Sequence, residues 1–60
     1  MNDLYGVSVN GAYVDVSKSI KGAKRYATLN GFSEVYARYN CGYNVTLVSE
    51  KLNNKWNDVL

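Results

Sequence analysis

The 60-residue chain contains no histidine and only one cysteine. The absence of histidine removes the commonest general base and metal ligand, and it leaves no serine–histidine or cysteine–histidine pair to activate a nucleophile. The five acidic residues are scattered along the chain and form no recognisable carboxylate pair. We therefore expect a protein that is not an enzyme and that binds no metal or other cofactor.

The single cysteine, Cys41, excludes a disulfide within the chain, which fits a reducing compartment. It stands between Asn40 and Gly42 at the tip of a predicted hairpin, where we expect its thiol to be exposed. No adjacent cation is placed to activate the thiol. We interpret Cys41 as a loop residue, and reaction or dimerisation through its thiol is the alternative.

Long apolar segments are also absent. No run approaches the roughly 20 residues that span a bilayer, and the N-terminus "MNDLYGVSVN" lacks the basic start and apolar stretch of a signal peptide. These features predict a cytoplasmic protein that does not bind membranes. The length predicts a single domain over residues 1–60, which buries only about 60% of its unfolded surface. Because such domains often need a disulfide, a metal or a partner chain, a homodimer is one expectation.

The net charge of +2 is small, but the positive charge is concentrated in one region. Residues 17–31 contain no acid and four cations: Lys18, Lys21, Lys24 and Arg25. The rest of the chain has more acids than cations. This distribution predicts one basic surface, which is either an ordinary solvated face or a docking site for an anion or an acidic protein.

The segment "LYGVSVNGAYVDV" predicts a β-hairpin. Its apolar residues alternate on both sides of Asn10-Gly11, and this dipeptide favours a two-residue turn because both turn positions need positive φ. Such a turn places six residues on one face of the hairpin. They form the pairs Val9–Ala12, Val7–Val14 and Tyr5–Val16.

The next segment, "SKSIKGAKRYATLNG", predicts a helix. Ser17 or Ser19 can cap its start, and Gly31 can end it in the left-handed conformation. Gly22 weakens it by roughly 1 kcal/mol relative to alanine. A helical period gathers a thin stripe for burial against a sheet: Ile20, Ala23, Tyr26, Ala27 and Asn30. The outer side then holds Lys18, Lys21, Lys24, Arg25 and Thr28.

The stretch "YARYNCGYNV" predicts the turn of a second hairpin. A three-residue loop over residues 40–42 keeps apolar residues on one face and puts Gly42 where a left-handed residue is favoured. The apolar pairs are then Tyr39–Tyr43, Ala37–Val45 and Val35–Leu47. The opposite face carries Glu34, Tyr36, Arg38, Asn40, Asn44, Thr46, Val48 and Glu50.

A last strand follows the tight turn that Asn53-Asn54 predicts, and it covers the segment "KWNDVL". The predicted pairs are Lys51–Trp56 and Val48–Val59. Two residues then lie on the core face, Trp56 and Leu60. The predicted fold class is α+β, with an antiparallel sheet, the element order ββαβββ and a single helix that covers one face of the sheet.

Two surfaces of this fold are candidate binding sites. The outer helix face presents the cations Lys18, Lys21, Lys24 and Arg25. The uncovered sheet face presents Tyr36 and Arg38, with Tyr13 facing the same way. Tyrosine and arginine dominate the energetics of many interfaces, although aromatic residues also suit strands for purely structural reasons. Such a face can also stack single-stranded bases.

The runs "SKSIKGAKRYATLNGFSEVYARY" and "LVSEKLNNKW" resemble an arrangement in very small phage-encoded proteins, including type I anti-CRISPR inhibitors. The shared features are a basic "AKRxA" helix and antiparallel strands that end near "NxKW". The resemblance covers about two thirds of the chain, without the first hairpin. It implies a stoichiometric inhibitor that occludes or reshapes a host complex. The contacts that it implies are Lys24, Arg25, Lys55 and Trp56, with a core position as the alternative for Trp56.

The sequence therefore predicts a non-enzymatic phage or mobile-element protein that inhibits a host macromolecular complex in the host cytoplasm. Docking on a host protein or ribonucleoprotein through the basic helix and the Tyr36/Arg38 face would block that complex sterically. The alternative is a small nucleic-acid-binding regulator that uses the same cations. A third interpretation is a structural or oligomerising module with open sheet edges.

Overall fold

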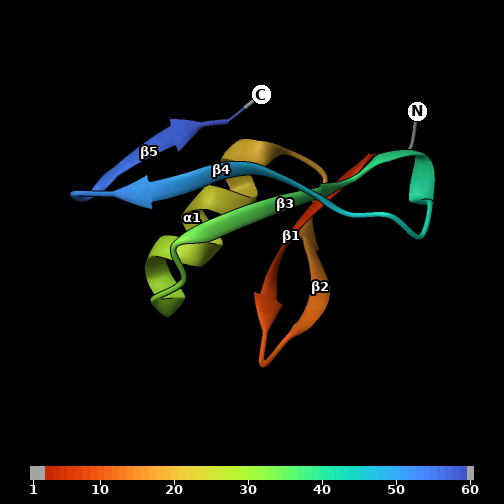
Figure 1. The fold of residues 1–60 in the computed structure, drawn as a ribbon, viewed down its shortest axis with the longest axis horizontal. Coiled ribbons are helices and arrows are strands. Elements are labelled where there is room, and N and C mark those ends of the chain that lie inside the picture. Colours follow the sequence, from red (N-terminus) through yellow and green to blue (C-terminus); the bar gives the residue numbers. More distant parts are fainter. Residues whose placement is uncertain (1–2, 60) are drawn as a thin grey trace.

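The computed structural model describes residues 3–59, with the exception of the Cys41 side chain. Five strands and one helix follow each other in the predicted order, which confirms the α+β fold. Their bounds are β1 Leu4–Val9, β2 Ala12–Ser17, α1 Ile20–Asn30, β3 Glu34–Arg38, β4 Thr46–Leu52 and β5 Lys55–Asp58. The strands form one antiparallel sheet in the order β2-β1-β3-β4-β5, and α1 lies behind it in the view of Figure 1.

The turn between β1 and β2 forms as its sequence predicts. Asn10 and Gly11 both have positive φ, of 53° and 84°, so the turn twists in the same sense as the strands. The register next to the turn is confirmed. It contains the pairs Val9–Ala12 and Val7–Val14.

Farther from this turn the register slips, and the predicted pairing of Tyr5 with Val16 is wrong. Tyr5 lies opposite Ser17, and Gly6 lies opposite Asp15, so β2 contains one extra residue. At this bulge the backbones come close together, because a Cβ on Gly6 would lie only 1.9 Å from the carbonyl oxygen of Val14. Glycine is therefore the residue that lets the two strands approach.

Helix α1 begins and ends where the sequence predicts. The Ser19 hydroxyl caps the start by accepting a hydrogen bond from the Gly22 amide at 3.1 Å, and Gly31 ends the helix with φ of 78°. The fully buried residues of the helix are Ala23 and Ala27, so its axis lies close to the sheet. Tyr26 and Asn30, predicted for the buried stripe, are exposed instead.

The predicted register of the second hairpin is wrong. Tyr36 lies opposite Leu47 and Ala37 opposite Thr46, so the connection is longer than three residues. Its left-handed residue is Asn40, with φ of 54°, whereas Gly42 is extended with φ of −75°.

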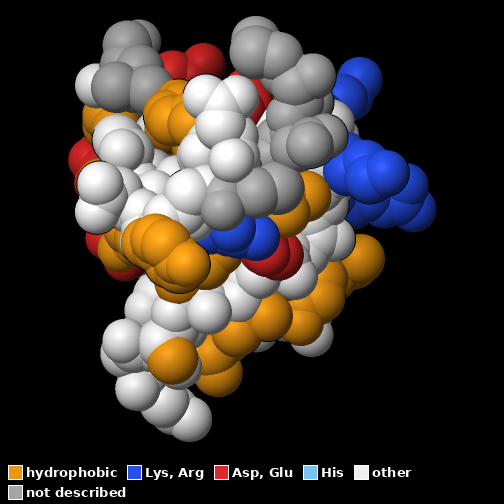
Figure 2. Space-filling view, turned by 90° about the vertical axis from the view of Figure 1, so that its right-hand side faces the viewer, with side chains coloured by type: hydrophobic (Ala, Val, Ile, Leu, Met, Phe, Trp, Pro, Cys, Tyr) orange, Lys and Arg blue, Asp and Glu red, His pale blue; other side chains and the backbone are white. Residues whose placement is uncertain are grey.

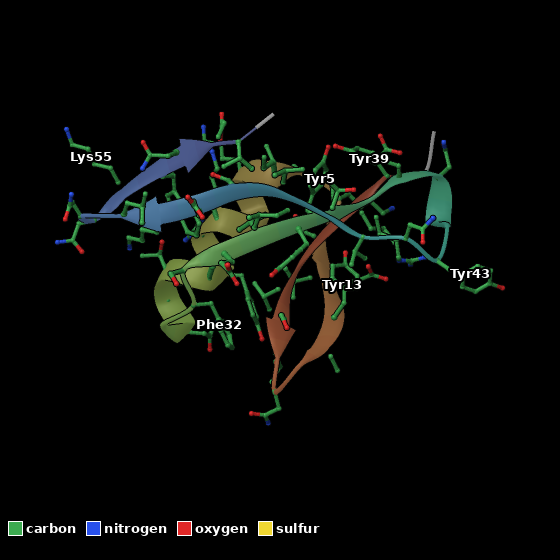
Figure 3. The ribbon with its side chains drawn as sticks, viewed as in Figure 1. Tyr5, Tyr13, Phe32, Tyr39, Tyr43 and Lys55 are labelled. Carbon is green, nitrogen blue, oxygen red and sulfur yellow. The ribbon has the colours of Figure 1, made fainter. Side chains whose placement is uncertain are left out.

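The tyrosines of this connection do not fill the core. Residues 39–41 form a short 3₁₀ turn, and the predicted core pair Tyr39 and Tyr43 is exposed. Tyr43 is fully exposed and points away from the molecule (Figure 3). The thiol of Cys41, which we predicted to be exposed, lies outside the described part of the chain.

A bulge in β4 changes which residues face the helix. Val35 lies opposite Ser49 and Tyr36 opposite Leu47, so Val48 is the extra residue. Val48 belongs to the buried core, which corrects its predicted place on the uncovered face.

Strand β5 forms as predicted around the pair Lys51–Trp56. The Val59 amide donates a 3.0 Å hydrogen bond to the Val48 carbonyl, which continues the predicted register beyond the strand. Asn53 and Asn54 both have positive φ in the preceding turn. Leu60, which we predicted on the core face, lies outside the described residues.

The hydrophobic core between sheet and helix is small. Its buried residues are Val7, Ala23, Ala27, Val35, Ala37 and Val48. Half-buried aromatic and aliphatic side chains close its rim, among them Tyr5, Phe32 and Trp56. Three of the six buried residues are alanines, so this core stabilises the fold modestly. No helix within residues 3–59 is long and apolar enough to cross a membrane.

Candidate docking surfaces

Three exposed cations lie just before and within α1, and we call Lys18, Lys21 and Arg25 the helix cation face. Lys21 and Arg25 are four residues apart, so they share one side of the helix. Among the described residues, none of the three forms an ion pair. Figure 2 shows Lys and Arg side chains gathered on the side of the molecule where α1 lies.

The position of these cations opposes the stability of the helix. The start of a helix carries the positive end of its dipole, where acidic side chains are favourable and basic ones are not. The first turn of α1 contains no acidic residue, and Lys18 and Lys21 lie beside it. Helix stability therefore does not explain why lysines occupy these positions.

The same side of the helix becomes apolar toward its end. Leu29 follows Arg25 by four residues and is 75% exposed. Tyr26 lies next to this row, is 40% exposed and stacks on Phe32 with a ring separation of 6.4 Å. The helix therefore presents cations followed by an apolar end, and the arginine and the tyrosine among these residues are of types enriched at protein interfaces.

Lys24 does not belong to the helix cation face, although the sequence placed it there. Its ammonium group lies 3.0 Å from the Asp58 carboxylate in an ion pair with β5. The hydrogen bond from Lys24 lowers the pKa of the Asp58 carboxyl group. Thr28, also predicted on the outer side, accepts a 3.3 Å hydrogen bond from the Trp56 indole. Both residues therefore tie the helix to the last hairpin.

The two contacts that the resemblance implied near the C-terminus differ in their environment. Trp56 is half-buried, packs against the core, and lies 5.9 Å from the ammonium group of Lys51, which supports its alternative structural role. Lys55 is exposed and projects outward from the tip of the last hairpin (Figure 3). Lys55 is thus accessible, but it lies on a different element from the helix cation face.

The uncovered sheet face contains Tyr36 and Arg38, and Arg38 is engaged within the protein. Its guanidinium group donates hydrogen bonds to both carboxylate oxygens of Asp15 and a third, at 3.1 Å, to the Gly42 carbonyl. The hydrogen bonds from Arg38 lower the pKa of the Asp15 carboxyl group. Arg38 therefore links β2 to the 39–45 connection, and binding a partner would have to compete with these contacts.

Tyr36 and Tyr13 lie together on the uncovered face, as the sequence predicts. Both line a shallow hollow of about 130 Å³ with Ser8, Gly11 and Val45. The Tyr36 hydroxyl donates a 3.0 Å hydrogen bond to Glu34, and burial raises the pKa of Tyr36. Burial also raises the pKa of Tyr13, whose ring occupies the space that a side chain on Gly6 would take. The aromatic rings of this face therefore cover the part of β1 where Gly6 has no side chain.

The described residues contain no group of three histidine, cysteine, aspartate or glutamate side chains that could hold a metal ion. Tyr43 is an exposed residue that sequence reasoning missed. Tyr43 was missed because the apolar alternation suggested a shorter loop.

No protein-family model, curated protein or solved structure matches the chain.

Proposed function

We propose that this chain is a non-enzymatic phage or mobile-element protein that inhibits a host macromolecular complex by docking on it. Inhibition is by steric blockade, as in the anti-CRISPR inhibitors that the sequence resembles. The observation that carries the proposal is the helix cation face. Its exposed lysines stand where they oppose the helix dipole and form no ion pair with a described residue, so binding a partner explains them better than folding does.

A protein or ribonucleoprotein fits this surface because the cations continue into exposed apolar side chains. Lys21 and Arg25 can meet acidic groups, while Leu29 and Tyr26 supply apolar contact area. The Tyr36/Arg38 face is the weaker candidate, since Arg38 already binds Asp15 and Gly42.

An infection assay tests this function. A bacterial strain with an active type I CRISPR system restricts a targeted phage, and expression of the chain should restore plaque formation. Replacing two cations, Lys21→Ala/Arg25→Ala, should abolish this protection. The control Asn10→Asp/Ser33→Glu changes the net charge by the same amount at two other exposed positions, and it should protect fully. Restriction that persists with the unaltered chain would refute the anti-CRISPR form of the proposal.

A nucleic-acid-binding regulator is the second candidate, and the same cations support it. Binding through phosphates would be strong at about 50 mM salt and would collapse by about 200 mM, because bound counterions are released. A gel-shift experiment with single- and double-stranded probes at both salt concentrations distinguishes the two functions. A salt-sensitive shift that Lys21→Ala/Arg25→Ala removes would favour this candidate, whereas no shift at low salt would exclude it.

A further inference from the structure

The sheet has two outer edges, and they differ in what they offer to another strand. Strand β2 forms one edge and β5 the other. Next to a two-residue turn, the pair Val9–Ala12 exchanges its backbone hydrogen bonds, and so does every second pair after it, which includes Val7–Val14. The backbone groups of the intervening residues in β2, Tyr13 and Asp15, therefore point away from β1.

The β2 edge is open. Among residues 3–59, no backbone hydrogen bond from another segment reaches it. Its side chains include Val14, which is 44% exposed, and the exposed Ala12. In Figure 2, hydrophobic side chains run along the lower part of the molecule, where the β1–β2 hairpin lies. The edge thus combines unused backbone donors and acceptors with apolar side chains, which is the combination that pairs with another strand.

The β5 edge is protected by comparison. This strand has only four residues, Lys55–Asp58, with a charged residue at each end. Asp58 is held in an ion pair by Lys24. Short, charged edge strands disfavour pairing with other chains. A molecule with one open edge and one protected edge can form a closed pair, whereas two open edges would lead to extended assemblies.

We propose that a second copy of this chain pairs with β2 in antiparallel orientation, about a two-fold axis at Val14. In this register Tyr13 exchanges backbone hydrogen bonds with Asp15 of the partner subunit, and Val14 contacts its own copy at the axis.

Two neighbouring registers are less favourable. Centring the axis on Asp15 brings two carboxylates directly opposite each other, which is destabilising. Centring it on Tyr13 pairs Asp15 with Gly11, a turn residue with φ of 84°, and so shortens the ladder. In the register centred on Val14, each Asp15 also keeps its ion pair with Arg38 of its own chain, so no unpaired charge enters the interface.

The small core explains why pairing with a second copy would stabilise the protein. Six small residues form the buried core, and chains of this size often gain stability by association. Pairing buries Val14 and satisfies the Tyr13 and Asp15 backbone groups. It continues the sheet from one copy into the other and places both α1 helices on the same face. The pairing does not depend on the proposed inhibitory function.

The test compares two exposed valines on opposite edges of the sheet. Val14→Lys places two lysines at the axis, while Val59→Lys makes the same change beyond β5, where the valine is 46% exposed. Sedimentation equilibrium over a wide concentration range should show the unaltered chain and Val59→Lys approaching twice the 6.7 kDa monomer mass. Val14→Lys should stay a monomer with an unchanged circular dichroism spectrum.

Two further measurements identify the interface. Mixing Val14→Lys with Val14→Glu should restore the dimer, because opposite charges then meet at the axis, whereas Val14→Glu alone should be a monomer. Hydrogen exchange at the Tyr13 and Asp15 amides should slow as the concentration rises, without change at the Val14 amide. The proposal is overturned by an unaltered chain that stays monomeric, by dimers of Val14→Lys, or by equal loss of association in Val59→Lys.

Discussion

The β1–β2 and β3–β4 hairpins both contain a bulge, but their chains reverse direction in different ways. The first uses a two-residue turn whose conformation comes from Asn10 and Gly11 themselves. The second uses the 39–45 connection, which contacts distant residues. The Asn40 amide donates to the Asp3 carboxylate at 2.9 Å. The Gly42 carbonyl accepts from Arg38, which also binds Asp15 in β2. Local chemistry therefore sets one register, and tertiary contacts set the other.

The largest expected effect comes from Gly6, where β1 and β2 are closest. Gly6→Val should destabilise the protein by about 3 kcal/mol or more, because its Cβ would overlap the Val14 carbonyl and the Tyr13 ring. Urea unfolding followed by circular dichroism measures this loss. Ser8→Ala, two residues along the same strand, should change the stability by less than about 0.5 kcal/mol. Equal losses in both variants would mean that the close approach at Gly6 is not the cause.

Arg38 joins the two hairpins, so its removal tests whether they depend on each other. Arg38→Met keeps most of the aliphatic stem but loses the hydrogen bonds to Asp15 and Gly42. We expect a loss of about 1 to 2 kcal/mol, since the contact is partly exposed to solvent. Urea unfolding of Arg38→Met, Asp15→Asn and the double variant gives the coupling energy. A coupling energy near zero would contradict a link between the hairpins.

Acid should weaken the same link. The hydrogen bonds from Arg38 lower the pKa of the Asp15 carboxyl group in the folded state. The stabilisation is present above the unfolded pKa of about 3.9, and it is lost as the pH falls through the lower folded value. The free energy of unfolding, measured from pH 6 to pH 2, should show this loss of stabilisation. The free energy of unfolding should decline less steeply with falling pH in Arg38→Met. An identical decline in both proteins would exclude Asp15 as a contributor to the loss of stability in acid.

The turn residues themselves should give a smaller effect. Gly11→Ala forces an alanine into φ of 84°, which costs about 1 kcal/mol. Asn40→Gly should change the stability by only a few tenths of a kcal/mol, because glycine adopts the left-handed conformation readily. Thermal unfolding of both variants tests whether the two turns depend on their own residues to different degrees. A larger loss of stability in Asn40→Gly than in Gly11→Ala would contradict this expectation.

These contacts explain how much the sequence could predict. The order of the elements, both ends of α1 and the register near Asn10-Gly11 follow from local rules, and all are confirmed. The exposure of the helix cation face also follows from helical periodicity. The position of Lys24 does not, because its partner Asp58 is 34 residues away in the chain.

The bulges could not be predicted from the sequence, for a different reason. Alternation of apolar residues assumes a constant register, but β4 contains one extra residue, Val48, which belongs to the core. The connection before β4 is longer than the predicted loop, and it leaves Tyr43 in solvent. Gly22 is another position that local sequence rules do not explain. Its propensity alone suggests a weak point in the helix, yet a Cβ there would lie 2.3 Å from the Ser17 hydroxyl oxygen. Packing against Ser17 at the end of β2, which no local rule contains, favours glycine at this position.

Among the variants that remove a contact, Asp3→Ala should have the smallest effect on stability, and it distinguishes the two hairpins most directly. Asp3→Ala removes the acceptor of the Asn40 amide, an exposed hydrogen bond that we expect to contribute only about 0.5 kcal/mol. Hydrogen exchange should nevertheless be faster at the Asn40 amide and through the 39–45 connection, while the amides of the β1–β2 hairpin keep their rates. A uniform increase over both hairpins would indicate global destabilisation. An unchanged connection would show that Arg38 alone holds the second hairpin in place.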